Sequence, residues 1–225
     1  MKFYLPSMDQ LEDFPPVEEA LSEPNGLLAF GGDLTAKTLI RAYHLGIFPW
    51  FSDQEPILWW SPNPRMVLFP EKIHLSRSFK RALKKTDYSV HFNRNFKQVI
   101  HHCSQTRKDG LGTWITQEMK QAYGQLHKLG IAHCLEIDIK GQLAGGIYGI
   151  ELEGIFFGES MFSLQTNGSK YALYELCQYL IKNKIPILDC QADNPHLQSM
   201  GAEMIPIRKF KKFLPQNRSS KHLFE

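Results

Sequence analysis

The hydrophobic pattern divides this chain into short apolar runs and amphipathic segments, separated by turns that contain glycine and proline. Apolar runs at hairpin spacing predict strands over 132–139, 143–151 and 154–161. Residues that recur at steps of three and four predict helices over 76–85 and 169–183. From residue 66 onward, strands and helices succeed one another in an order typical of an α+β fold, with a mixed sheet flanked by helices.

The beginning of the chain has a different character. Large aromatic residues and prolines crowd residues 46–64, and such aromatics form either a core or a stacking platform. A strand over 27–30 and a helix capped by Asp33 are expected before them. We therefore predict a small aromatic-rich N-terminal α/β lobe over residues 1–62 and a larger domain over residues 63–225. A last strand is expected over 202–207.

Composition excludes several classes of protein. The chain has 225 residues, of which 43% are hydrophobic and 22% charged, as in ordinary globular proteins. No apolar run approaches the roughly 20 residues that span a bilayer, and the N-terminus lacks a signal-peptide core. The four cysteines form no CxxC pair, and no histidine stands at metal-ligand spacing. We expect a cytoplasmic protein with no membrane segment and no metal.

Positive charge is concentrated on one predicted helix. Residues 72–86 contain six lysines and arginines and no aspartate or glutamate. Because they are three or four positions apart, Arg77, Lys80, Arg81 and Lys84 share one face of the helix. A solvated charged face and a surface for a polyanion both fit this pattern.

A second unusual feature is the pair Asp189 and Gln191, which directly follows the apolar residues Ile187 and Leu188. On an extended strand, residues two apart point to the same face, so a carboxylate and an amide are expected side by side. Ligands of open α/β sheets bind at such strand ends. The alternative is an aspartate that caps the next turn. In either case a buried Asp189 needs a hydrogen-bond partner.

Six segments, in order, resemble the leucyl/phenylalanyl-tRNA–protein transferases: EPNGLLAFGGDL (23–34), GIFPWF (46–51), LWWSP (58–62), TWIT (113–116), FGESMFS (157–163) and LDCQ (188–191). The resemblance covers residues 20–208. It implies an acyl-CoA N-acyltransferase-like fold for the larger domain and a bacterial, cytoplasmic enzyme that needs no metal or organic cofactor. We also expect a monomer. The implied activity transfers leucine or phenylalanine from leucyl-tRNA or phenylalanyl-tRNA to the α-amine of proteins that begin with Arg or Lys. This transfer marks them for degradation.

The resemblance also implies residue roles. Asp189 and Gln191 are expected to be catalytic, with the Gln191 carbonyl accepting a hydrogen bond from the attacking amine, and Glu159 is expected to bind the positive charge of the protein substrate. An exposed Glu159 at a strand end is the alternative. The expected aminoacyl pocket consists of Ile147, Phe156, Leu176, Leu180 and Leu188, each of which also suits a plain core. The expected tRNA-binding residues are Trp50, Trp114, Arg77, Lys80, Arg81, Lys84 and Lys85.

Three other functions fit parts of the sequence. Residues 142–146 are faintly similar to the pyrophosphate loop of CoA-dependent N-acetyltransferases, although they lie in strand-rich sequence. A cell-wall-type peptidyl transferase that uses aminoacyl-tRNA is a second alternative. A non-catalytic tRNA-binding module is the third.

Overall fold

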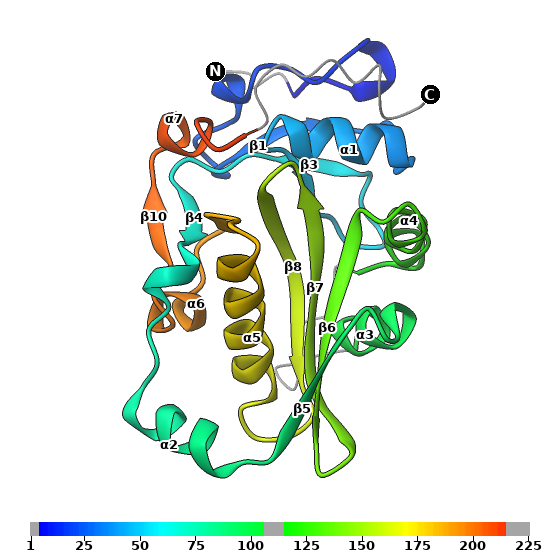
Figure 1. The fold of residues 1–225 in the computed structure, drawn as a ribbon. Coiled ribbons are helices and arrows are strands. Elements are labelled where there is room, and N and C mark those ends of the chain that lie inside the picture. Colours follow the sequence, from blue (N-terminus) through cyan, green and yellow to red (C-terminus); the bar gives the residue numbers. More distant parts are fainter. Residues whose placement is uncertain (1–4, 106–114, 215–225) are drawn as a thin grey trace.

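The computed structural model describes residues 5–105 and 115–214 (Figure 1). Its strands are β1 Leu27–Phe30, β2 Phe48–Pro49, β3 Leu58–Trp60, β4 Arg65–Leu68, β5 Tyr88–Phe92, β6 Ala132–Ile139, β7 Gln142–Leu152, β8 Ile155–Ser163, β9 Leu188–Gln191 and β10 Glu203–Ile205. Its α-helices are α1 Ala36–His44, α2 Arg77–Lys85, α3 Phe96–Cys103, α4 Gln117–Lys128, α5 Gly168–Lys182, α6 Pro195–Ser199 and α7 Ile207–Phe210. Three 3-10 turns, η1 Met8–Gln10, η2 Val17–Glu19 and η3 Pro70–Lys72, complete the elements of the described residues.

A seven-stranded mixed sheet forms the centre of the molecule, in the order β10-β4-β9-β8-β7-β6-β5. All neighbouring strands are antiparallel except β8 and β9, which are parallel. The hairpin strands β6, β7 and β8 match the predicted segments to within two residues. The predicted α+β class with a mixed sheet is confirmed.

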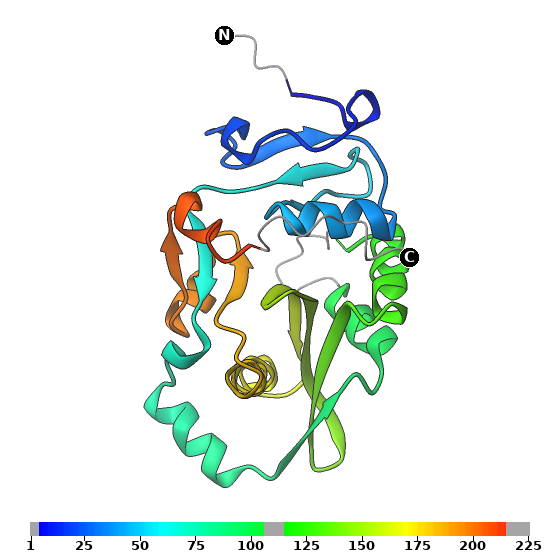
Figure 2. The ribbon, with the colours of Figure 1, turned by 45° about the horizontal axis from the view of Figure 1, so that its top comes forward.

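Helices cover both faces of this sheet. Helix α5 packs along one face against β6, β7 and β8, and α3 and α4 pack on the other (Figures 1 and 2). Each face has its own buried cluster. The cluster under α5 includes Phe156, Leu176 and Leu188, and the opposite cluster includes Tyr148 and Phe157.

Local sequence explains where the helices begin. The side chains of Thr35, Ser76, Asn95, Thr116 and Asn194 each accept a hydrogen bond from a backbone N–H of the first helical turn. Asp33 was therefore the wrong cap for α1. Its carboxylate accepts hydrogen bonds from the N–H of Thr35 and the hydroxyl of Thr38 instead.

The predicted strand over 202–207 was too long. Strand β10 ends at Ile205, and the chain turns into α7 immediately after Pro206. Proline has no N–H for a strand ladder and its fixed φ suits the start of a helix, which explains the early end.

The N-terminal lobe contains a three-stranded sheet in the order β1-β3-β2 and helix α1. It lies across one end of the large sheet (Figure 2). Its residues Trp59 and Leu39 belong to the same buried cluster as Tyr148 and Phe157 of the large sheet. The lobe and the large sheet therefore share a core, and the boundary after residue 62 stays a prediction.

Within residues 5–105 and 115–214, no helix has both the length and the apolar character that a membrane crossing requires.

Candidate active site

The candidate site lies where β8 and β9 stop pairing. Their parallel ladder joins only Phe156 to Leu188 and Phe157 to Asp189. Beyond it, the contact between the strands is made by side chains, as Gln191 Nε2 donates to Glu159 Oε1 over 2.8 Å. The two strands thus hold the predicted residues Glu159, Asp189 and Gln191 together.

Glu159 occupies a β-bulge. Strand β7 pairs Tyr148 with Ser160 and Gly149 with Gly158, so Glu159 is the extra residue between the two pairs. A Cβ on Gly149 would lie 2.2 Å from the Phe157 carbonyl oxygen, so only glycine fits opposite the bulge. Bulges re-aim side chains beside functional sites. Glu159 is only 8% exposed, so the alternative of an exposed strand-end glutamate is wrong.

Two buried tyrosines complete the surroundings of Glu159. Tyr43 of α1 lies 2.8 Å from Oε1 and Tyr123 of α4 lies 2.9 Å from Oε2, and their own hydroxyl oxygens are 2.5 Å apart. These three oxygen–oxygen contacts need three protons, whereas the two hydroxyls supply two. A protonated Glu159 would supply the third.

The electrostatic surroundings agree with this proton count. Burial raises the pKa of Glu159 to about 7, although the hydrogen bonds from Tyr43, Tyr123 and Gln191 act in the opposite direction. Glu159 therefore titrates near neutral pH, a property typical of functional carboxyl groups.

The backbone of Gln191 differs from the expected extended strand. Its φ is +65°, a left-handed conformation that costs free energy for any residue other than glycine. Asp189 Oδ1 accepts the Gln191 backbone N–H at 2.9 Å and holds this conformation. The two side chains nevertheless lie on the same face of the sheet, opposite α5, as predicted. Asp189 contacts Arg65 beside Phe48 and Phe210, and Gln191 contacts Glu159 beside Tyr43. Only the expected extended backbone at Gln191 was wrong.

The orientation of the Gln191 amide follows from its partner. Because Nε2 donates to Glu159, Oε1 points away from that carboxyl group. Within the described ranges, no hydrogen bond to Gln191 Oε1 is present. This carbonyl oxygen is available as an acceptor for a substrate.

Asp189 has the partner that its burial requires. Arg65 Nε donates to Oδ1 at 2.8 Å and Nη2 donates to Oδ2 at 2.6 Å, and both residues are 0% exposed. The rings of Phe48 and Phe210 lie on the guanidinium carbon, each centroid 4.8 Å away. Asp189 therefore combines the predicted turn-capping bond with a buried ion pair.

The five residues of the expected aminoacyl pocket lie together on the α5 face. Each is at most 5% exposed and all belong to one buried cluster: Ile147, Phe156, Leu176, Leu180 and Leu188. The Glu159 network lies on the opposite face, with Tyr43 and Tyr123. The two groups meet at β8 and β9, because Leu188 directly precedes Asp189 and pairs with Phe156.

The expected tRNA-binding residues occupy two separate surfaces. Trp50 is 44% exposed and packs against Trp60, with ring centroids 5.5 Å apart. Helix α2 carries Arg77, Lys80, Arg81, Lys84 and Lys85, all exposed. It lies at the end of the molecule opposite the N-terminal lobe (Figures 1 and 2). Trp114 lies outside the described residues.

Sequence reasoning missed Arg65, Tyr43 and Tyr123. An arginine at the first position of an otherwise apolar strand was a usable signal, because the buried Asp189 needed a cation or donors. Tyr43 falls on the apolar face of its helix, where its hydroxyl needs a partner. The pairing of α1 with α4 through Glu159 depends on the tertiary fold and has no local signal.

The site as a whole offers a hydrogen-bond acceptor, a titrating carboxyl group and an adjacent apolar cluster. No grouping of three or more His, Cys, Asp or Glu side chains suited to a metal ion occurs in the parts of the chain that the structure covers.

The chain is similar in sequence to proteins of one family. The sequence model described as leucyl/phenylalanyl-tRNA protein transferase matches residues 67–215, and the model of the corresponding N-terminal domain matches residues 32–63. The leucyl/phenylalanyl-tRNA–protein transferase of Nitrosomonas europaea is 52% identical over 203 residues, which cover 90% of this chain and 86% of that protein. The protein of the same name from Idiomarina loihiensis is 52% identical over 88% of this chain and 84% of its own. The solved structure of L-PGS from Bacillus licheniformis matches at a TM-score of 0.40 and 14% identity, over 72% of this chain and 52% of that one.

Proposed function

Because this chain belongs to the leucyl/phenylalanyl-tRNA–protein transferase family, whose members are aminoacyltransferases, we propose that it transfers leucine or phenylalanine to the α-amine of proteins that begin with Arg or Lys. The donor is leucyl-tRNA or phenylalanyl-tRNA. The enzyme acts as a cytoplasmic monomer, and the product is marked for degradation. The observation that carries the proposal is the Gln191 amide, which Glu159 and Asp189 hold, and whose oxygen accepts no hydrogen bond from residues 5–105 or 115–214.

The reaction itself needs little acid–base assistance. The aminoacyl ester is already activated, and an α-amino group has a pKa of about 7.7–8.0, so about a tenth of it is neutral at pH 7. Supplying the neutral amine costs about 1 kcal/mol. Positioning the amine against the ester carbonyl then provides most of the acceleration.

Gln191 positions the amine in this proposal. Its Oε1 accepts a hydrogen bond from the attacking nitrogen and directs the nitrogen lone pair toward the ester. The bond from Nε2 to Glu159 prevents the amide from flipping. Asp189 contributes by holding the Gln191 backbone. As the new C–N bond forms, the ester bond to the ribose breaks, and the released ribose oxygen takes the proton that the amine loses and becomes a hydroxyl.

Glu159 binds the positive charge of the protein substrate. A carboxyl group with a pKa of about 7 ionises when an ammonium group approaches it, since an opposite charge favours the charged form. Tyr43 and Tyr123 then stabilise the carboxylate by two hydrogen bonds. The site therefore gains its negative charge when a cationic substrate binds.

The leucyl or phenylalanyl side chain contacts the apolar cluster on the other side of β8 and β9. We propose that it enters where the ladder of these strands stops, after Phe157 and Asp189. Ile147 and Leu188 contact it first, and Leu176 and Leu180 of α5 close the pocket.

The tRNA contacts the two surfaces described above. The exposed face of Trp50 stacks on the 3′-terminal adenosine, an interaction of about 1–3 kcal/mol, with Trp114 as the second expected contact. The basic residues of α2 bind backbone phosphates without reading the sequence.

The decisive experiment mixes the protein with tRNA carrying labelled leucine and with peptides that begin with Arg, Lys or Ala. Label is expected in the Arg and Lys peptides and not in the Ala peptide. Absence of transfer to all three peptides, with intact leucyl-tRNA recovered, would refute the proposed function. Acetyl transfer from acetyl-CoA to the same peptides would favour the N-acetyltransferase alternative.

A further inference from the structure

We propose that Arg65 is a positioning residue for the aminoacyl transfer, acting through Asp189 on Gln191. The guanidinium fixes the Asp189 carboxylate, and the carboxylate fixes the left-handed backbone of Gln191. This inference rests on the proposed function, and it adds a residue outside the two strands that carry the site.

The hydrogen bonds form one continuous chain. Asp189 Oδ1 accepts both from Arg65 Nε at 2.8 Å and from the Gln191 backbone N–H at 2.9 Å, while Oδ2 accepts from Arg65 Nη2 at 2.6 Å. A two-point contact prevents rotation of the carboxylate. If it rotated, Oδ1 would leave the Gln191 N–H and the backbone would lose the bond that supports its φ of +65°.

The surroundings of the guanidinium direct it only at Asp189. Nη1 has no hydrogen-bond partner among the described residues. The two hydrogen bonds that the guanidinium donates, from Nε and Nη2, therefore both go to that carboxylate. The rings of Phe48 and Phe210 hold its plane. A lysine ammonium is a point charge and reproduces neither the two-point contact nor the stacking.

Stability alone does not account for this pair. A buried ion pair loses so much hydration energy that a well-packed apolar pair of similar volume is often as stable or more stable. Arg65 and Asp189 are both fully buried between apolar rings and strands. A role in holding Gln191 explains why charges occupy this part of the core.

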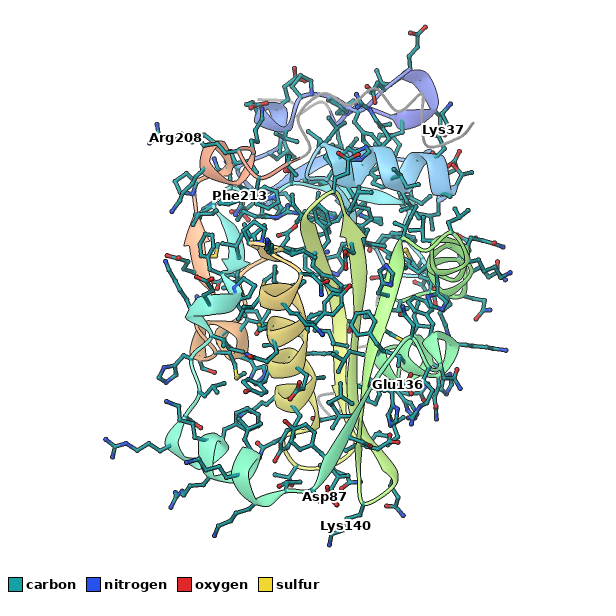
Figure 3. The ribbon with its side chains drawn as sticks, viewed as in Figure 1. Lys37, Asp87, Glu136, Lys140, Arg208 and Phe213 are labelled. Carbon is teal, nitrogen blue, oxygen red and sulfur yellow. The ribbon has the colours of Figure 1, made fainter. Side chains whose placement is uncertain are left out.

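The chain offers a matched control in Arg94. This arginine also makes a two-point contact with an aspartate, Asp138, and a further bond to Glu136. Asp138 and Glu136 lie on β6, which is separated from β9 by β8 and β7. Glu136 is marked in Figure 3, beside α3. Loss of this contact affects an ion pair of the same chemistry without touching Gln191.

The test measures single-turnover transfer of labelled leucine to an Arg peptide at saturating substrates. Arg65→Lys is expected to lower the rate 10- to 100-fold, since a small misplacement of a positioning group can cost about 100-fold. The KM values for peptide and leucyl-tRNA are expected to change less than threefold. Arg94→Lys is expected to keep at least half of the rate.

A double-mutant cycle separates positioning from a structural role. On a Gln191→Ala background, Arg65→Lys is expected to lower the rate less than threefold further, because the group it positions is already gone. The proposal would be overturned if Arg65→Lys lowered the transfer rate by the same factor in the Gln191→Ala background as in wild type. An unchanged rate in Arg65→Lys would also overturn it.

If Arg65→Lys does not fold, a second variant that leaves no unpaired charge in the core tests the same proposal. Arg65→Met combined with Asp189→Leu replaces the ion pair by apolar side chains and is expected to fold. Its rate is expected to be as low as that of Gln191→Ala, and a folded variant with the wild-type rate would refute the role of Arg65. Wild-type protein that transfers no leucine would instead remove the proposed function itself.

Discussion

Replacement of Glu159 by glutamine tests the unusual protonation of this site. Glutamine has the shape of a protonated carboxyl group and, like it, one acceptor oxygen and a donor, with one additional N–H. Its Nε2 can donate to Tyr123, while its Oε1 accepts from Tyr43 and from Gln191. The variant therefore preserves the network inferred for neutral Glu159 and removes only its titration.

The magnitude follows from the pKa of Glu159. Burial raises it from an ordinary value of 4.5 to about 7, and this interval corresponds to roughly 3 kcal/mol. Below pH 4.5 the carboxyl group is protonated in both the folded and the unfolded chain. As the pH rises from 4.5 to 7, the unfolded chain loses the proton first, so the free energy of unfolding falls. Above pH 7 the fall is complete.

Urea unfolding of wild type and Glu159→Gln at pH 4.5, 6, 7 and 8 measures this effect. The free energy of unfolding of the variant, relative to wild type, is expected to rise by up to roughly 3 kcal/mol between pH 4.5 and 8. In thermal unfolding the corresponding change is about 6–12 °C for a chain of this size. Glu203→Gln is the control, because the Glu203 carboxylate is exposed in a surface ion pair with Lys72.

A difference between wild type and Glu159→Gln that stays constant over this pH range would refute the reasoning. The same variant also tests the binding role of Glu159. The KM for an Arg peptide is expected to rise more than the dissociation constant of leucyl-tRNA, and the opposite pattern would argue against a counter-ion.

Three further predictions concern the tRNA and the aminoacyl group. Affinity for leucyl-tRNA should fall steeply with salt, and Arg81→Ala should reduce the slope by about one unit; a flat salt response in wild type would exclude the phosphate contacts. Trp50→Ala should weaken leucyl-tRNA binding by about 1–3 kcal/mol and Trp50→Phe by less, as measured by filter binding. Leu180→Ala should lower the free energy of unfolding by about 2–5 kcal/mol. It should also raise the ratio of phenylalanine to leucine transfer in competition assays, and an unchanged ratio would show that Leu180 does not line the aminoacyl pocket.

The secondary structure of this protein was largely predictable because its signals are local. The caps at Ser76 and Thr116, the hairpin turns of β6 to β8 and the periodicity of α5 all lie within a few residues of the elements they define. The end of β10 at Ile205 was misjudged, although Pro206 gave a local signal for it.

The candidate site was only half predictable, since its contacts join distant segments. The positions of Glu159, Asp189 and Gln191 followed from motifs, but the partner of Asp189 is 124 residues away in sequence. The left-handed backbone of Gln191 had no signal either, because glutamine rarely adopts it. Its cause is the carboxylate of Asp189, which only the folded chain brings into place.

The measurement that tests the central claim most directly is single-turnover leucine transfer by Gln191→Ala at saturating leucyl-tRNA and Arg peptide. If the Gln191 carbonyl positions the amine, the transfer rate falls at least tenfold while both substrates bind as they do to wild type. A variant that transfers leucine at close to the wild-type rate would contradict the account.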